Sequence, residues 1–354
     1  MFIPENVIKV KGTYYEQGKL QGEKVADIIV KNIDSIKRSI SKSNINEKYY
    51  TELLEKNLRF IEEFEPDIFE EIRGISDGSG IEFQDIALIN IPHYYMLNIL
   101  PNECSSILAR GRATFDGSTY LIKNRDLTTT VYQIVLEREY TNGDRIIEVN
   151  GAGIVTYPGI GINKYGLALS TSGVWSKKIP VDGTSISKAH ILINTHLILE
   201  RCKDVNEAIY YLNNMPRVNG MNLIITDRSK AVAVEATSDK ILIEEDKNGI
   251  LARTNHYTSD ELKGLSKSPK EYQSTYMRFE RILNFLNKKY GKIKFQDMLE
   301  IVSDHENGPE NCICRHSIDE SESKTVSSSL IVLEDMQIWT ALCNPCESLK
   351  LAYV

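Results

Sequence analysis

Hydrophobic positions divide the chain into a helical first part and a strand-rich remainder. Between residues 25 and 40 the apolar side chains recur at the 3.6-residue spacing of an amphipathic helix, with Lys31, Asp34 and Lys37 on the opposite face. In the stretches that follow, proline and glycine residues mark where helices end. We therefore predict helices over residues 25–40, 47–64, 67–75 and 81–91, so that residues 1–100 are read as helical.

From Cys104 onward the pattern alternates with a period of two and is rich in β-branched residues, which indicates strands. Asp116-Gly117, Asn142-Gly143 and Asn248-Gly249 are turn pairs typical of hairpins. Predicted strands cover residues 106–109, 119–123, 133–140, 145–149, 166–171, 223–226, 231–235, 240–244, 250–254, 328–333 and 337–342. Predicted helices cover 187–202, 205–214, 272–289 and 295–303. Hairpins with segregated helices predict an α+β protein with mainly antiparallel sheet, and the lack of a linker-like segment predicts one domain over residues 1–354.

Composition narrows the function classes. The 354 residues are 42% hydrophobic and 26% charged, which is typical of a globular protein, and the net charge of −7 argues against nucleic-acid or anionic-membrane partners. No signal peptide or membrane span is visible, and six cysteines are too few for a disulfide scaffold, so a cytoplasmic setting is expected. Without a glycine-rich phosphate loop, no cofactor is expected; a homo-oligomer remains open.

Cys104 is the strongest candidate for chemistry. It stands at the start of a strand whose hairpin partner ends at Asp126, so we expect the thiol and the carboxylate to be neighbours. A buried, inert thiol is the alternative. A nucleophilic cysteine needs a base, and no histidine is near in sequence. Cleavage before Cys104 would supply one, because the new α-amine has a pKa of about 7.7–8.0 and Asp126 could orient it.

Several motifs resemble the acyl-coenzyme A:6-aminopenicillanic acid acyltransferase family (peptidase family C45), which consists of self-cleaving N-terminal-nucleophile (Ntn) hydrolases. The similarity spans nearly the whole chain in the family's order. Its motifs are KGTYYEQGKLQG at 11–22, ECSS at 103–106, ATFDGSTYLIKNRD at 113–126, GINKYGLAL at 161–169, MNLIITDRSKAVAVE at 221–235, TNH at 254–256, Ser274 with Arg278, Asp304-His305, Cys314-Arg315-His316 and Pro345-Cys346.

This resemblance implies a four-layer αββα Ntn fold and autocatalytic cleavage between Glu103 and Cys104. The products would be an N-terminal segment 1–103 and a segment 104–354 that begins with the nucleophile. A cysteine amidohydrolase or acyltransferase is implied, acting on a small acyl-amide or acyl-thioester substrate. Asp126 matches the carboxylate near the nucleophile, and Asn222 matches an active-site asparagine that would donate to the oxyanion.

Further positions are assigned to the substrate site or its surroundings: Lys123, Asn124, Asn255, His256 and Arg315. Relatives often have glycine where this chain has Glu103, and Arg or Gln where it has Lys123, which supplies charge but no bidentate fork. For Arg315 we favour a role in bracing the loop 304–309 over anion binding. His305 and His316 are expected to be structural.

Two alternative functions stay open. An uncleaved, non-catalytic relative would keep the fold and act as a binding protein. A zinc-dependent hydrolase would use four thiolates, Cys312, Cys314, Cys343 and Cys346, although the one-residue spacer of the first pair is poor knuckle geometry, and our prediction for the site contains no metal.

Overall fold

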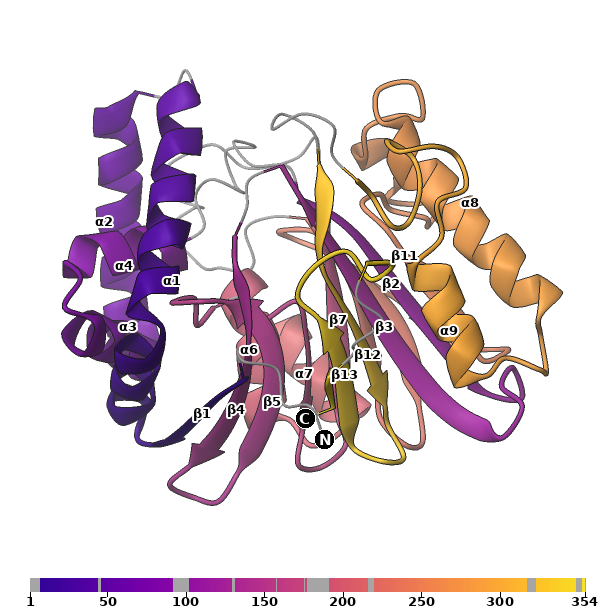
Figure 1. Ribbon diagram of the computed structural model, residues 1–354, viewed down its shortest axis with the longest axis horizontal. Helices are drawn as coiled ribbons and strands as arrows, with labels where there is room; N and C mark the ends of the chain where they lie inside the picture. Colours follow the sequence, from indigo (N-terminus) through magenta and orange to yellow (C-terminus); the bar gives the residue numbers. More distant parts are fainter. Residues whose placement is uncertain are drawn as a thin grey trace.

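Two β-sheets lie face to face between two groups of helices (Figure 1). The structure is a computed structural model that describes residues 7–43, 46–91, 102–128, 131–156, 158–174, 176, 191–215, 220–316, 323–347 and 352–353. Helices α1–α4, α6 and α7 cover the outer face of the first sheet, and α8 and α9 cover the outer face of the second. The predicted four-layer αββα architecture is confirmed.

The first sheet has eight strands and is antiparallel except where β1 joins β4. In spatial order its strands are β1 (Val7–Gly12), β4 (Gln133–Tyr140), β5 (Arg145–Gly151), β6 (Ile160–Asn163), β7 (Ala168–Gly173), β8 (Met221–Thr226), β9 (Ala231–Ala236) and β10 (Ile241–Glu245).

The second sheet has six antiparallel strands and carries the residues around Cys104. Its order is β11 (Ile250–Arg253), β2 (Asn102–Gly111), β3 (Gly117–Leu127), β12 (Lys324–Val332), β13 (Gln337–Ala341) and β14 (Ala352–Tyr353). The two sheets bury an apolar layer between them, to which Leu108 and Leu121 contribute from this sheet and Val135, Ile162 and Ile224 from the first. Alternation along each strand then decides which side chains reach that layer.

Helix bounds follow the predicted periodicity closely except at the first helix, which begins at Tyr14 and not at residue 25. The helices are α1 (Tyr14–Lys42), α2 (Glu47–Phe64), α3 (Pro66–Ser79), α4 (Phe83–Asn90), α6 (Ile191–Arg201), α7 (Val205–Asn214), α8 (Gln273–Lys288) and α9 (Phe295–Val302), with a short 3₁₀ turn at Lys263–Leu265. Of the predicted helix 187–202, residues 187–190 lie outside the described part. None of the described helices is long and apolar enough to cross a membrane.

Glycines explain the motif that opens the family resemblance. A Cβ on Gly18 would lie 2.1 Å from the carbonyl oxygen of Glu71, and one on Gly74 would lie 2.1 Å from that of Tyr15. Helices α1 and α3 therefore approach so closely that only glycine fits at their crossing. Thr13 starts α1 with a capping box to Glu16. The motif is explained by helix packing.

Two expectations about the strands were wrong. Residues 1–100 are not all helical, because Val7–Gly12 forms β1 beside β4. Asn248-Gly249 joins β10 to β11, which lie in different sheets, so the turn is not a hairpin. The hairpin predicted at Asp116-Gly117 is confirmed: β2 and β3 pair up to Gly111 and Gly117, with residues 112–116 in the loop.

Candidate active site

Cys104 is the third residue of strand β2, close to the start of the strand as its sequence context predicted. Its side chain is fully buried. Alternation places Cys104 and Ser106 on the face that meets the first sheet, where Ser106 Oγ lies 2.9 Å from Ser172 Oγ. In the uncleaved chain the thiol is therefore enclosed between the two sheets.

The backbone of Cys104 is held at both ends by side chains distant in sequence. Its N–H donates to Asn255 Oδ1 at 2.8 Å, and its carbonyl oxygen accepts from Arg278 Nη1 at 2.7 Å. Arg278 Nη2 also donates to Asn255 Oδ1, at 2.9 Å. Asn255 Nδ2 donates to the Gly173 carbonyl at 2.8 Å, which fixes the orientation of its amide so that the oxygen faces Cys104. The predicted site residue Asn255 is thus in direct contact with Cys104.

Arg278 is the residue that the sequence prediction of the site missed. It was noticed only as part of a helical motif, yet its fully buried guanidinium on α8 also donates to Ser105 Oγ at 3.0 Å. It lies 3.4 Å from a carboxylate oxygen of Glu103 and 3.9 Å from one of Asp126. One cation therefore contacts the residues on both sides of the predicted cleavage bond.

Glu103 is buried and its carboxylate is paired with two arginines. Arg315 forms an ion pair with it, and Ser274 Oγ donates to it at 3.3 Å. Arg315, expected to brace the loop 304–309, directs its guanidinium to Glu103, and Arg281 pairs with Asp304 of that loop. Ion pairs with Arg278 and Arg315 therefore hold the side chain of Glu103, the residue before Cys104, in place.

Asp126 does not contact the Cys104 amide as predicted. The strand register sets Asp126 opposite Glu103 and sets Arg125 opposite Cys104, so alternation directs the Asp126 carboxylate away from the thiol. It accepts from Thr325 Oγ1 at 2.6 Å. Burial raises its pKa to about 6, although the Arg278 charge and the Thr325 hydrogen bond oppose this. Asp126 is linked to Cys104 through Arg278, which lies 3.9 Å from its carboxylate and donates to the Cys104 carbonyl.

The raised pKa of Asp126 predicts a change in stability with pH. The pKa of Asp126 is about 6 in the folded protein and about 3.8 in the unfolded chain, so between these values the folded state binds more protons. The free energy of unfolding should therefore fall by about 3 kcal/mol as the pH rises from about 3.8 to about 6. Asp126→Asn should lack this loss. Chemical denaturation at pH 4, 5, 6 and 7 measures the difference in unfolding free energy between the wild type and the variant. His256, whose pKa is lowered to about 4 by burial and by Arg278, makes the folded state more stable as the pH rises. This contribution is the same in both proteins and cancels in the difference. A constant difference across this range would contradict the assignment.

Lys123 and Arg125 are cations on the same side of the sheet as the Cys104 thiol, and Lys123 carries the ammonium. Lys123 is directly opposite Ser106 on β3, and its fully buried ammonium donates to the Thr171 carbonyl. Burial lowers its pKa, while the Cys104 thiol acts to raise it and the Arg125 charge to lower it. A lysine in this position is suited to stabilise a thiolate or an anion formed beside it.

The other predicted residues have mostly structural contacts. Asn222 Nδ2 donates to the carbonyls of Thr254 and His256 at 2.9 and 2.8 Å, so both N–H groups expected for an oxyanion are already engaged. Asn124 Nδ2 donates to the carbonyls of Val302 and Ile313.

His256 is likewise held away from the thiol. Its Nδ1 contacts Thr275 Oγ1 at 2.9 Å, and its ring stacks on Tyr276 at 3.9 Å between centroids. With its lowered pKa the imidazole is neutral near pH 7. It supports the turn that presents Asn255.

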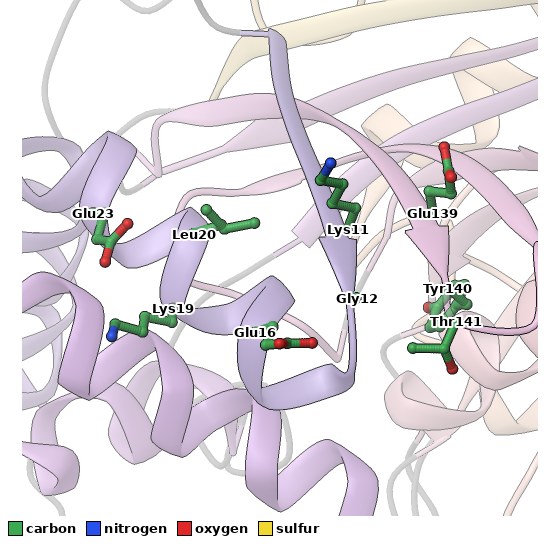
Figure 2. A pocket seen from close by; sticks show the side chains of 9 residues that line it. All are labelled: Lys11, Gly12, Glu16, Lys19, Leu20, Glu23, Glu139, Tyr140 and Thr141. Atoms are coloured by element: carbon green, nitrogen blue, oxygen red, sulfur yellow. The ribbon is translucent and has the colours of Figure 1, made fainter.

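Three cavities lined by described residues lie away from Cys104. The pocket in Figure 2, of about 560 Å³, is lined by side chains from β1, α1 and the end of β4, including Lys11, Glu16 and Glu139. Two others, of about 570 and 760 Å³, lie beside Arg112 and Tyr50. None of the three includes Cys104, which agrees with the burial of its thiol.

Comparison with solved structures identifies the fold as that of the Ntn hydrolases. A variant of the conjugated bile acid hydrolase from Clostridium perfringens is similar with a TM-score of 0.50 and 17% identity, over 71% of this chain and 92% of the other. A penicillin V acylase from Agrobacterium tumefaciens has a TM-score of 0.47 and 18% identity, over 68% and 83% of the two chains. A Caenorhabditis elegans N-acylethanolamine-hydrolyzing acid amidase ortholog has 0.49 and 15%, over 65% and 93%. A search of curated proteins finds no match.

The sequence identifies the family. The model of the acyl-coenzyme A:6-aminopenicillanic acid acyl-transferase family matches residues 113–347, well over half of the chain, and the chain belongs to this family. The protein is an Ntn-type amidohydrolase or acyltransferase. Cys104 precedes the matched range.

Proposed function

We propose that the chain cuts itself between Glu103 and Cys104 and then uses Cys104 as an N-terminal nucleophile on a small N-acyl amide or thioester. The observation that carries this proposal is the pair of contacts on the Cys104 backbone: Asn255 accepts from its N–H, and Arg278 donates to its carbonyl. Strand β11 pairs with β2 only as far as Ser106, so side chains rather than a strand satisfy both backbone groups of Cys104, and this places an amide oxygen and a guanidinium beside the bond to be cut.

Self-cleavage begins at the Cys104 thiol. Its sulfur attacks the carbonyl carbon of Glu103; a C–S bond forms, the C–N bond breaks, and the proton lost by sulfur ends on the Cys104 nitrogen. Water then hydrolyses the thioester, which leaves a carboxylate on Glu103 and restores the thiol. The ion pairs of Glu103 with Arg315 and Arg278 hold the acyl side of this bond in place.

The released α-amine becomes the base for the same residue's thiol. Its pKa of about 7.7–8.0 leaves part of it neutral near pH 7. Asn255 Oδ1 already accepts from this nitrogen, so it would orient the amine with its lone pair available for the thiol proton. The thiolate then attacks the substrate carbonyl, the leaving group takes the proton, and a thioester acyl-enzyme forms. Water or an amine accepts the acyl group in the second half of the reaction.

Lys123 supplies positive charge on the side of the attack. Its buried ammonium lies on the same sheet face as the thiol, and a positive charge in a water-poor site stabilises the thiolate and the tetrahedral oxyanion strongly. The substrate class follows from the family, whose name specifies an acyl thioester as donor and an amine as acceptor.

Trapping the acyl-enzyme tests this proposal. After incubation with a short-chain acyl-coenzyme A, rapid acid quenching and peptide mapping should locate one thioester adduct on a peptide that begins with Cys104. Cys202→Ser is the matched control, because Cys202 is buried and its pKa is raised to about 12 by that burial. The adduct should persist in this variant. An adduct on another cysteine, or none with any of a panel of acyl thioesters and N-acyl amides, would contradict the proposal.

A further inference from the structure

Four metal-binding side chains converge on one point near the end of the chain. They are His305 after α9, Cys314 and His316 at the end of the loop that follows it, and Cys346 after β13; their ligand atoms all lie within 4.8 Å of one another. The distances are 3.1 Å between the two histidine Nε2 atoms and 3.5 Å between the two sulfurs. His316 Nε2 lies 3.1 Å from Cys346 Sγ and 3.9 Å from Cys314 Sγ.

The four distances, 3.1–3.9 Å, bracket the edges of a tetrahedron around zinc, and side-chain shifts of a few tenths of an ångström at these pairs, more for any pair as wide as 4.8 Å, would bring the ligand atoms to it. With Zn–S of about 2.3 Å and Zn–N of about 2.0–2.1 Å, ligand atoms are separated by about 3.3–3.8 Å. Hydrogen bonding alone explains the cluster poorly, because His316 Nε2 meets three polar partners and a ring nitrogen offers one proton or one lone pair. A cation in the centre would satisfy all four side chains at once.

The groups around the cluster are those that support metal ligands. Glu347 places a carboxylate oxygen 3.4 Å from His316 Nδ1, the ring nitrogen that faces away from the cluster. Asn344 Nδ2 lies 3.6 Å from Cys314 Sγ, where it can donate to a thiolate. Arg281 anchors Asp304, the neighbour of His305. Burial raises the pKa of Cys314 to about 12, so a metal would have to displace its proton.

We propose that His305, Cys314, His316 and Cys346 form a structural Zn²⁺ site. Four protein ligands leave no open position for water or substrate, so the site is closed and does not support the zinc hydrolase considered from the sequence. The thiol set differs as well. Cys312 Sγ donates to the Cys314 carbonyl at 2.9 Å, and Cys343 Sγ lies 3.6 Å from the Asn344 carbonyl, so neither joins the cluster.

The zinc site has a consequence for the residue between two of its ligands. Arg315 is flanked by Cys314 and His316, and its guanidinium pairs with Glu103. Zinc would tie the loop after α9 to the loop after β13 and so hold Arg315 against the residue preceding Cys104. This consequence rests on the proposed function, whereas metal binding itself does not.

Metal analysis of the full-length protein tests the site without measuring activity. Protein purified under reducing conditions, stripped with a chelator and reloaded with Zn²⁺ should contain about one zinc per chain, and Co²⁺ in its place should give the intense visible absorption of a tetrahedral thiolate complex. Cys346→Ser and His305→Ala should each lower zinc affinity at least tenfold. Cys343→Ser, three residues from a ligand but outside the cluster, should bind zinc like the wild type.

Three results would overturn the proposal: no stoichiometric zinc in the reloaded wild type, equal affinity in Cys343→Ser and Cys346→Ser, or a Cys314–Cys346 disulfide in the reduced preparation by intact mass. His305 is exposed, so His305→Ala keeps the test decisive if a cysteine variant misfolds. If zinc binds as expected but the chain does not cleave itself, the zinc site is supported and only the proposed function is contradicted.

Discussion

Replacing Cys104 with alanine is expected to leave the chain uncut and to lower acyl transfer by about 10⁴-fold or more, because the nucleophile and the base belong to the same residue. Loss of one side chain removes the attacking sulfur, and the uncut peptide bond keeps the α-amine from forming. Denaturing electrophoresis and turnover of an acyl thioester measure the two effects separately.

Cys202→Ser controls for the loss of a buried thiol. Cys202 is buried behind the first sheet, in the core that includes Leu199 and Val205. This variant should cleave and turn over like the wild type. A Cys104→Ala protein that retains wild-type activity would show that the chemistry lies elsewhere in the chain.

Arg278→Lys is expected to slow self-cleavage by about 100-fold, because lysine keeps the charge but cannot donate to the Cys104 carbonyl, Ser105 and Asn255 together. The lost hydrogen bonds should also cost about 1–3 kcal/mol of unfolding free energy. The appearance of the two fragments during cell-free synthesis of each chain, followed over time by electrophoresis, measures the first effect.

Arg138→Lys separates catalysis from stability. Arg138 is equally buried and pairs with Glu71 at 2.6 Å and Glu148 at 2.7 Å, on the other side of the first sheet. It should lose comparable stability and still cleave at the wild-type rate. Equal rates in the two lysine variants would mean that Arg278 only supports the fold.

Much of the fold could be predicted from the sequence because its determinants are local. The periodicity of residues 25–40 lies within α1, and the alternation that begins after Cys104 marks the strands of both sheets. Registers were harder to predict. The expected neighbour of Cys104 was Asp126, whereas the observed pairing sets Arg125 opposite it, and a shift of one residue sends a side chain to the other face.

The rest of the site depends on contacts across the chain. Asn255 and Arg278 reach Cys104 over separations of 151 and 174 residues, which no local pattern encodes. Asn255 was predicted only through the family motif. Arg278 appeared in a helical motif with Ser274, and the signal that could have identified it was an arginine placed among the apolar positions of an amphipathic helix.

The metal-binding cluster shows the same limit. From the sequence, four cysteines were considered as zinc ligands. In the structure Cys312 and Cys343 lie outside the cluster, and its other two members are His305 and His316. Spacing along one segment could not reveal this, because Cys346 comes from a different loop, 30 residues after His316.

Intact mass spectrometry of the freshly purified wild-type protein tests the central claim most directly. The account predicts that the 40.2 kDa chain is replaced by two fragments, residues 1–103 and 104–354, and that N-terminal sequencing of the larger fragment begins with Cys104. Cys104→Ala, purified in parallel, should give the full-length mass alone. A wild-type chain that stays intact and whose Cys104 thiol does not react with an alkylating probe would contradict the claim and favour the uncleaved binding protein.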